Sequence, residues 1–550
     1  MPIANSRTES LQQAQFRAVQ AITVKPEVLD ESNPTRQVLT GLMKHGGVYT
    51  LLDTEMMTAR LVPMLTRGSG AAAMSAEDAS TFVNGLGNTM ASFFQHLVPG
   101  KAYTIPSSLM SHIAFPGTGV SYSDPGLEQS DPGVFESPEV PAAFTFVGQF
   151  IDHDLTMNAV DLFEVQTDEV ANTASPLIDL DSVYGANRTK LTAPFSKIFH
   201  ADGRFRMVDR GGYEDLVRDE VGNALIGDQR NDENQMILQI HLLVMKVHNK
   251  LMAGGLGFEE AYRETLFNWQ SVLLTDYLPA ILEPATLAWL LGEIGKPDFG
   301  EFKYKPWKNL VDGKLAASMP HEFAIGFRFG HSQLRFGLRV NPGVGGMVRL
   351  FDNSLTSSGG KTSTGAVKNL FSDLRGSQEL VAEHVIDWGT FLGGATPLRS
   401  NRIDGKVTSV VFDLPESAIP DDIKYIGNLP QRNLIRSRQV GLCAGEDLAK
   451  FYGIERLATR KIEPDEAAHH LYMEKGHFRT PLWYYILKEA EAVGGPKSSR
   501  LGALGSRLIG EVIVGAIGFA PTNVLAEPGW KSSVTGSREV SLLELAEWVG

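Results

Sequence analysis

Four polar side chains lie close together in an otherwise apolar stretch of the sequence, residues 144–159. They are Gln149, Asp152, His153 and Asp154. On a helix, Gln149 and His153 are four residues apart and share one face, and Asp152 lies at the edge of that face. A histidine that titrates near neutral pH, beside a neutral amide, can take up a proton and return it. Taken alone, the stretch also fits a buried histidine that is satisfied by its polar neighbours.

A second segment, ASPLIDLDSVYG at residues 174–185, is rich in oxygen ligands. It offers the hydroxyl of Ser175, the carboxylates of Asp179 and Asp181, and main-chain carbonyls between them. Closely spaced hard oxygen ligands on a loop suit Ca²⁺. The segment is not an EF-hand, because its glycine and terminal carboxylate are misplaced. Taken alone, such a segment is more often an acidic turn.

Two further segments place charged or ligating residues beside apolar runs. In GDQRNDEN, residues 227–234, Arg230 and Glu233 are three apart, a spacing that also gives ordinary surface ion pairs. In EFAIGFRFGHSQLR, residues 322–335, His331 follows an aromatic run whose glycines permit a close approach of the backbone. Such a histidine is either a core residue or a ligand.

The segment NLPQRNLIRSRQVGL, residues 428–442, places Asn433 and Arg436 three residues apart, among other arginines. It is too short and too apolar for a nucleic-acid-binding arm, so its arginines are better suited to holding carboxylates. The net charge of −14 over 550 residues also argues against a nucleic-acid partner.

The pattern of apolar residues predicts a mainly α-helical protein that has long loops and few short strands. Residues 98–143 are rich in Pro, Gly, Ser and Asp, which favours loops. We expect an N-terminal helical extension over residues 1–90, followed by one large domain over 91–550. The clearest helical patterns lie at residues 76–98, 232–252, 258–282 (ending near Pro279) and 498–518.

The composition restricts where the protein functions. A single cysteine, Cys443, excludes an intrachain disulfide. The sequence shows no signal peptide and no apolar run of the ~20 residues that a membrane-spanning helix needs. We therefore expect a cytoplasmic protein with no integral membrane segment, although export by another route stays open. The oligomeric state is not predicted.

Taken together, GQFIDHDLT, DSVYG, GDQRNDEN, FRFGHS and RNLIRSRQVGL occur in an order that resembles the animal-type haem peroxidases of the peroxidase–cyclooxygenase superfamily. The likeness runs over about residues 144–453. It implies that residues 91–550 form a haem peroxidase domain with haem b and Ca²⁺ as cofactors. The lack of disulfides and of a signal peptide resembles a bacterial member of the family.

The resemblance implies roles for residues on both sides of the haem. His153 matches the distal histidine that moves the peroxide proton, Gln149 the distal glutamine, and Arg230 the distal arginine. On the other side, His331 matches the iron ligand and Asn433 its hydrogen-bond partner, and Arg436 matches an arginine near a haem propionate.

The resemblance also implies covalent and metal-binding roles. Asp152 and Glu233 match the carboxylates that form ester bonds to the haem in mammalian members, whereas Asn234 replaces the methionine that forms a sulfonium link. The implied Ca²⁺ ligands are Asp154, Ser175, the carbonyl of Leu177, Asp179 and Asp181.

The function implied is that of an enzyme of oxidative-stress chemistry. It uses H₂O₂ to oxidise a halide, thiocyanate or small organic donor through a ferryl intermediate. One alternative is a haem fatty-acid dioxygenase of the same superfamily. The radical-forming tyrosine of those enzymes would stand where this chain has Arg328. The alternative therefore requires a tyrosine at another position, such as Tyr304 or Tyr425. The other alternative is a haem-binding adhesion module without turnover.

Overall fold

The computed structural model describes residues 91–115, 119, 121–123, 135–157, 170–172, 174–185, 198–220, 222–296, 299–305, 307–311, 314–343, 346–352, 358–361, 367–370, 372–393, 398–415, 427–495, 499–520 and 522–550. Across these residues the chain is mainly α-helical with few short strands, so the predicted fold class is confirmed. The predicted extension over residues 1–90 lies outside the described residues, and the division at residue 90 stays a prediction.

Helices form most of the regular structure. The α-helices are α5 (Ser107–Ala114), α7 (Ala143–Leu155), α8 (Asp181–Tyr184), α9 (Gln235–Ala253), α10 (Phe258–Val272), α11 (Leu278–Ile281), α12 (Pro284–Ile294), α13 (His321–Gly326), α14 (Trp388–Leu392), α15 (Leu429–Gln439), α16 (Gly445–Tyr452), α17 (Thr459–Ile462), α18 (Leu482–Gly494), α19 (Ala503–Gly518) and α20 (Leu542–Val549). Short 3₁₀ helices include η5 (Gln229–Asp232) and η8 (Phe327–Ser332), and a π-helical turn, η6 (Leu273–Tyr277), joins α10 to α11.

The strands are short and mostly paired in twos. They are β1 (Ala91–Gln95), β2 (Ser121–Ser123), β3 (Glu136–Pro141), β4 (Val170–Ala171), β5 (Met207–Asp209), β6 (Glu214–Leu216), β7 (Trp307–Val311), β8 (Lys314–Pro320), β9 (Gly337–Leu338), β10 (Val348–Arg349), β11 (Ser358–Lys361), β12 (Val367–Leu370), β13 (Arg399–Asn401), β14 (Lys406–Thr408), β15 (Met473–Glu474) and β16 (His477–Phe478). The largest sheet among the described residues has the order β4-β1-β8-β7.

The predicted helix over residues 76–98 is wrong at its C-terminal end. Residues 91–95 form β1, which pairs in parallel with β8 from Ala91 opposite Ala316 to Gln95 opposite Pro320, and antiparallel with β4. Backbone hydrogen bonds to two distant strands therefore override the local helical pattern, which is a weak preference by comparison.

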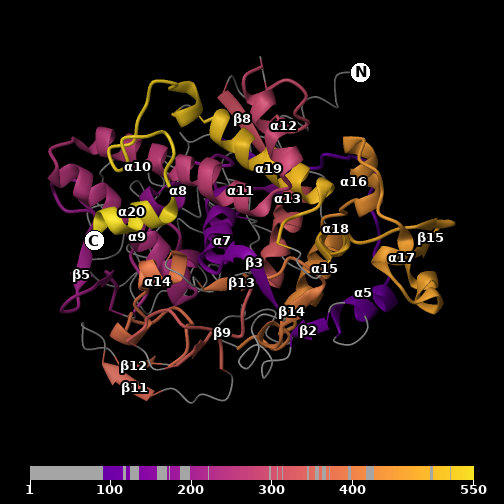
Figure 1. Ribbon diagram of the computed structural model, residues 1–550, viewed down its shortest axis with the longest axis horizontal. Helices are drawn as coiled ribbons and strands as arrows, with labels where there is room; N and C mark the ends of the chain where they lie inside the picture. The colour runs from indigo at the N-terminus through magenta and orange to yellow at the C-terminus, as the bar shows by residue number, and fades with distance from the viewer. Residues whose placement is uncertain are drawn as a thin grey trace, which may run out of the picture.

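Helix α7 lies at the centre of the molecule, with α9 and α10 on one side and α15 and α18 on the other (Figure 1). Most of its side chains are buried, including the polar His153 and Asp154. Helix α9 starts at a cap in which the Asn234 side chain accepts from the N–H groups of Met236 and Ile237. The core that holds these helices is one hydrophobic cluster of residues from Phe94 to Ala546.

The end of the helix predicted over residues 258–282 differs slightly from the expectation. The helix widens into the π-helical turn η6 and continues past Pro279 to Ile281 as α11. Proline lacks the N–H that an α-helix needs, and a π-helical turn is one way for a helix to accommodate a local distortion.

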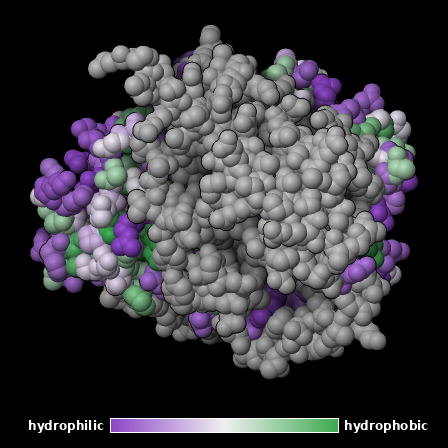
Figure 2. Space-filling model, turned by 180° about the vertical axis from the view of Figure 1, so that it is seen from behind, coloured by the Kyte–Doolittle hydropathy of each residue, from purple (hydrophilic) through white to green (hydrophobic). Residues whose placement is uncertain are grey.

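The described surface gives no sign of a membrane span. None of the described helices is both long and apolar enough to cross a bilayer. In Figure 2 the described residues at the margins are mainly hydrophilic, with small separate apolar areas. The large exposed hydrophobic residues among those described are Phe115, Leu291, Met473 and Val493.

Candidate active site

A cavity lies between helix α7 and the 3₁₀ helix η8. Gln149 and Asp152 of α7, Glu233, and His331 of η8 all line this cavity. The structure therefore brings four of the predicted site residues to one cavity, although they come from segments far apart in the sequence. Much of the remaining wall is apolar, and it includes Phe146, Phe327, Phe329, Leu334, Leu350, Phe351, Val411, Leu414 and Leu429.

His153 is fully buried and lies behind this wall rather than in it. Its Nδ1 is 2.9 Å from Oδ1 of Asn231, and its Nε2 is 4.0 Å from Oε1 of Glu233. Because an amide oxygen can only accept, Asn231 holds the proton on Nδ1 and leaves Nε2 as the basic atom. Burial and the charge of Arg230 lower the pKa of His153 to about 3, so the ring is neutral and able to accept a proton at neutral pH.

Arg230 is also buried behind the wall, where its guanidinium group is held by two partners. Its Nη2 donates to Oδ2 of Asp228 at 2.7 Å and to the carbonyl of His153 at 2.9 Å. The Arg230 charge lowers the pKa of the Asp228 carboxyl although burial opposes this. Arg230 thus pairs with Asp228 rather than with Glu233, the partner that the sequence spacing offered.

Gln149 connects two residues of the next segment. Its Nε2 donates to Oε1 of Glu233, and its Oε1 accepts from Nδ2 of Asn234 at 3.0 Å. Burial raises the pKa of Glu233 well above its usual value. Since His153 is neutral at neutral pH, the 4.0 Å approach of Oε1 of Glu233 to Nε2 of His153 is not an ion pair there.

Asp152 lies at the edge of the α7 face, as the helical spacing predicts. Its Oδ1 accepts from the hydroxyl of Thr156 at 2.9 Å. Burial raises the pKa of the Asp152 carboxyl, and the charges of Arg328 and Arg230 partly oppose this. Asp152 and Glu233 thus present two carboxyl groups to the same cavity.

His331 contacts Asn433, the partner that the resemblance implies. Nδ2 of Asn433 is 3.0 Å from Nδ1 of His331, and Oδ1 of Asn433 accepts from Arg328 at 3.3 Å. Burial, then Arg328, lowers the pKa of His331 to about 3, so the ring is neutral, as a metal ligand must be. A histidine that binds iron through Nε2 keeps its proton on Nδ1, and a half-turn of the Asn433 amide supplies the oxygen that accepts it.

Arg436 is buried on α15 but does not line the cavity. Its Nη1 donates to Oε1 of Gln439 at 2.8 Å. The arginines that line the cavity are Arg328 and Arg375. Asn433 therefore reaches the site through its contact with His331, whereas Arg436 is not part of the cavity wall.

Three carboxylates gather on the side of α7 opposite the cavity. Ligand atoms of Asp154, Asp179 and Asp181 all lie within 4.8 Å of one another. The Asp154 carboxylate accepts from the N–H groups of Leu180 at 3.1 Å and Ser182 at 3.2 Å. Leu180 adopts φ 61°, a left-handed conformation that is unfavourable for a residue with a side chain, so the loop is held tightly in this shape.

The predicted Ca²⁺ ligands therefore lie together in part. Burial and the neighbouring Asp179 raise the pKa of Asp154 to about 7, and the same causes raise that of Asp181. A divalent cation would remove this repulsion. Of the remaining predicted ligands, Ser175 donates its N–H to Asp181 at 2.8 Å, and the carbonyl of Leu177 accepts from the N–H of Asp179 at 3.1 Å.

Sequence reasoning did not find two residues that hold His153 in place. Asn231 contacts His153 with Oδ1, and its Nδ2 is 3.1 Å from Nδ1 of His241, so one amide connects two histidines. His241 is fully buried. Its position on the buried face of α9 was visible in the sequence, but the contact depends on how η5 folds back onto α7.

Residues 158–346 match the family model described as animal haem peroxidase. The match covers about a third of the chain. The matched residues include Arg230, Glu233 and His331, whereas Gln149 and His153 lie just before them.

Two curated relatives from Mus musculus are similar to this chain over part of their length. Myeloperoxidase is 26% identical over 249 residues, which are 43% of this chain and 30% of the relative. Eosinophil peroxidase is 26% identical over 315 residues, which are 52% of this chain and 39% of the relative. The chain thus spans 30% to 39% of the length of these two relatives.

Solved structures of two kinds are similar to this chain at low identity. Peroxidase A from Dictyostelium discoideum has a TM-score of 0.49 at 15% identity, with 78% of this chain and 87% of that chain covered. Fatty acid alpha-dioxygenase from Oryza sativa has a TM-score of 0.46 at 14% identity, with 90% of each chain covered. Likeness at this level does not distinguish the two activities.

Proposed function

We propose that this chain is a haem peroxidase that uses H₂O₂ to oxidise a halide, thiocyanate or small organic donor. The observation that carries the proposal is that His331 and Gln149 line one cavity, while Nε2 of a neutral His153, oriented by Asn231, lies 4.0 Å from Glu233 in the same cavity wall. A neutral histidine suits an iron ligand on one side, and a second neutral histidine suits proton transfer on the other.

The cavity fits a haem group in its chemistry. Its walls carry a neutral histidine and a pair of carboxyl groups, the apolar lining suits a porphyrin ring, and Arg328 and Arg375 suit its propionates. When bound, the haem supplies an iron centre at which peroxide is reduced. His331 would hold this iron, and Asn433 would fix the orientation of the His331 ring.

The residues of α7 and η5 would act on the peroxide. Nε2 of His153 takes a proton from one peroxide oxygen and gives it to the other, and Asn231 keeps the ring in the tautomer that this transfer requires. Gln149 orients water and the donor at the cavity wall. Arg230 would contribute positive charge from behind His153. Its ion pair with Asp228 would reduce the effect of this charge.

We propose that the carboxyl groups of Asp152 and Glu233 form ester bonds to the haem. Both line the cavity, and burial favours the neutral acid form of each. Extraction with acidified acetone, followed by mass spectrometry, tests this part of the proposal. Complete extraction of unmodified haem b would show that neither ester forms.

The carboxylate cluster around Asp154 is proposed to bind Ca²⁺ as a structural ion. Asp154 directly follows His153 on α7, so an ion at this point ties the loop of α8 to the helix that carries the proton-transferring residue. The ion would stabilise the fold and hold His153 in position. It would not contact the electron donor.

The dioxygenase alternative needs an oxidisable tyrosine at the haem. Tyr304 is buried but does not line the cavity, Tyr425 lies outside the described residues, and Arg328 lines the cavity where the dioxygenases have tyrosine. Tyr277 does line it, but its side chain is fully buried. Haem-loaded protein given linoleate and O₂ should show no oxygen uptake; clear uptake would replace the peroxidase proposal with the dioxygenase one.

Dye oxidation tests the peroxidase proposal. Haem-loaded wild-type protein should oxidise guaiacol with H₂O₂, and His153→Ala should lower the rate by about 10²- to 10⁴-fold, the usual contribution of a general acid–base residue. Control measurements of haem content separate loss of chemistry from loss of cofactor. Haem-loaded wild-type protein without dye oxidation would favour the adhesion module without turnover.

A further inference from the structure

Asn234 lies between the 3₁₀ helix η5 and α9, and its buried side chain forms part of the cavity wall. Its Oδ1 accepts from the backbone N–H groups of Met236 at 3.1 Å and Ile237 at 3.0 Å, which caps α9. Its Nδ2 donates to Oε1 of Gln149 at 3.0 Å. One side chain therefore caps a helix and also holds a residue of the proposed active site.

The cap decides how both amides are turned. A backbone N–H group can only donate, so the atom of Asn234 that meets two such groups is its oxygen. The other atom is the nitrogen, which must face an acceptor, so the atom of Gln149 that it meets is an oxygen. The nitrogen of the Gln149 amide is therefore the atom that donates to Oε1 of Glu233. A cap at the start of α9 thus fixes the amide of a residue on α7.

The backbone beside Asn234 is held by a second segment of the chain. The N–H of Gly376 donates to the carbonyl of Glu233 at 2.8 Å. A Cβ atom at Gly376 would collide with the carbonyl of Asp232, so this close approach requires glycine. Asn234 is thereby a fixed point from which its amide can orient a neighbouring side chain.

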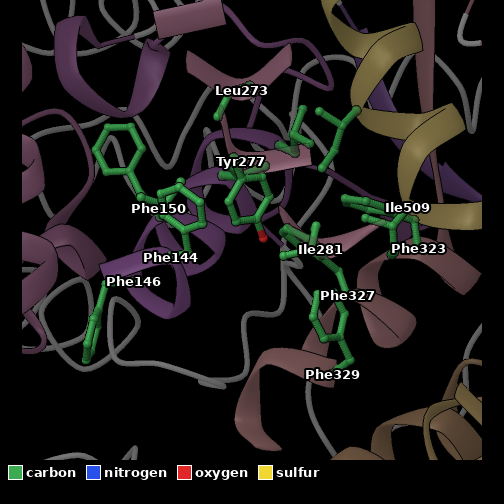
Figure 3. Close-up of a cluster of buried hydrophobic side chains, with 14 of the residues drawn as sticks. Phe144, Phe146, Phe150, Leu273, Tyr277, Ile281, Phe323, Phe327, Phe329 and Ile509 are labelled. Carbon is green, nitrogen blue, oxygen red and sulfur yellow. The ribbon is translucent and has the colours of Figure 1, made fainter. Parts of the chain in front are cut away.

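The backbone of α7 is held by apolar packing. Phe144 and Phe150 are buried in the hydrophobic cluster that Figure 3 shows, where Phe144 packs edge to face on Tyr277 with ring centroids 5.6 Å apart. Gln149, in contrast, is only partly buried and lines the cavity. What its contacts must still determine is which end of the side-chain amide faces each neighbour.

The orientation of the Gln149 amide decides which kind of group it offers to the cavity. Its oxygen accepts from Asn234, and its nitrogen donates one of two N–H groups to Glu233. The second N–H group can donate to an acceptor in the cavity, whereas a turned amide would offer an acceptor instead. A donor that is already oriented binds more tightly, because no orientation has to be selected first.

We propose that Asn234 is a positioning residue that acts through Gln149, holding its amide so that the nitrogen is available to a hydrogen-bond acceptor in the cavity. The proposal rests on the proposed peroxidase function, and it gives a role to the residue that stands where a sulfonium-forming methionine would be. Because Asn234 also caps α9, its test has to separate the two roles.

Equilibrium titration of the haem-loaded ferric protein with azide, a small anion that binds haem iron, tests the proposal through the shift of the Soret band. Asn234→Ser keeps a capping oxygen but removes the donor to Gln149. It should weaken azide binding about 2- to 5-fold, with the lower value for an amide that is turned half of the time and the higher value for a lost hydrogen bond.

Another capping asparagine provides the matched control. Asn523 caps η15 (Val524–Ala526), its Nδ2 donates to the carbonyl of Ala520 at 2.7 Å, and it does not line the cavity. Asn523→Ser therefore removes a comparable donor from a comparable cap, and it should leave the azide affinity unchanged.

A double-substitution cycle shows whether Asn234 acts through Gln149. Gln149→Leu alone should weaken azide binding about 5-fold, and Asn234→Ser added to it should have no further effect. Equal azide affinity in wild type and Asn234→Ser would overturn the proposal. So would an undiminished effect of Asn234→Ser in the Gln149→Leu background, because Asn234 would then act by another route.

Urea denaturation separates the capping role from the positioning role. Asn234→Ala, which removes the cap, should unfold at a lower urea concentration, whereas Asn234→Ser should unfold close to wild type. Haem-loaded wild-type protein that binds no azide would overturn the proposal while guaiacol turnover still stood. Azide binding that depends on Asn234, without guaiacol turnover, would instead refute the proposed function.

Discussion

Nδ1 of His153 lies 2.9 Å from Oδ1 of Asn231, on a side chain that also reaches His241. The contact joins α7 to η5 and decides which nitrogen of the buried His153 is basic. Proton transfer at Nε2 therefore depends on a residue that does not line the cavity. Several expected outcomes follow from this arrangement and from the interactions that support it.

Replacing Asn231 should impair the reaction with peroxide. Asn231→Val removes the acceptor and should slow the second-order reaction with H₂O₂ by about 10- to 100-fold, as is usual for residues that orient a reactive histidine. Asn231→Asp keeps an oxygen acceptor and should retain more of the rate. Stopped-flow spectroscopy of haem-loaded proteins measures both; equal rates in wild type and Asn231→Val would contradict the role of Asn231.

The ion pair of Arg218 with Asp232 should be essential for stability. Arg218 donates to Asp232 at 2.6 Å and 2.8 Å, and both side chains are buried. Arg218→Met leaves the Asp232 carboxylate buried without this partner and should lower the free energy of unfolding by about 3–5 kcal/mol. Because Asp232 belongs to η5, the substitution should also displace the Asn231 side chain from its position beside His153.

Urea denaturation measures the effect of Arg218→Met, and an exposed ion pair provides the control. The side chains of Arg460 and Glu466 are 73% and 69% exposed, so Arg460→Ala should cost less than about 1 kcal/mol. Similar losses in the two variants would mean that burial does not decide the contribution of the Arg218 pair.

Calcium should stabilise the protein through the carboxylate cluster. Addition of Ca²⁺ to chelator-treated protein should raise Tm, because the ion relieves repulsion among Asp154, Asp179 and Asp181. Asp179→Asn should reduce the shift, and the exposed Asp202→Asn should preserve it. Differential scanning calorimetry decides; an identical Tm with chelator and with Ca²⁺ would show that the cluster binds no structural Ca²⁺.

Glu489 should make stability depend on pH. Its carboxylate accepts from the N–H groups of Leu504 at 3.0 Å and Gly505 at 3.1 Å at the start of α19, and burial raises its pKa from 4.5 to about 7. Between these values the folded state binds more protons than the unfolded state. The stabilisation is therefore complete below about pH 4.5 and is lost as the pH rises to about 7.

Comparison of wild type with Glu489→Gln isolates this contribution, because glutamine stays neutral. The free energy of unfolding of wild type relative to the variant should fall between pH 4.5 and 7.5, by on the order of 3 kcal/mol. Urea titrations across this range measure the difference. A difference that does not change with pH would show that the pKa of Glu489 is not raised.

The sequence predicted those features that depend on residue type and local periodicity. The helical face shared by Gln149 and His153, the long helix that became α9, and the mainly α class all follow from apolar spacing. Asp179 and Asp181 could be grouped because they lie on one short loop, whereas Asp154 was added only through the family resemblance.

The features that sequence could not predict depend on contacts between distant segments. The strand β1 forms because its backbone pairs with β8 and β4, and the local sequence of residues 91–95 does not predict this pairing. The pairing of Arg230 with Asp228, the link from His153 through Asn231 to His241, and the place of Tyr277 opposite Gly148 all require the packed arrangement of α7, η5 and η6. The resemblance supplied roles for individual residues but not these partners.

The central claim is that His331 holds a haem in the cavity that faces α7. Titration of haem-free protein with haemin, followed by the Soret band, tests it most directly. We predict saturation at one haem per chain in wild type, and in His331→Gly a loss of the histidine-ligated spectrum that added imidazole restores. A wild-type protein that develops no Soret band of a bound haem would contradict the account.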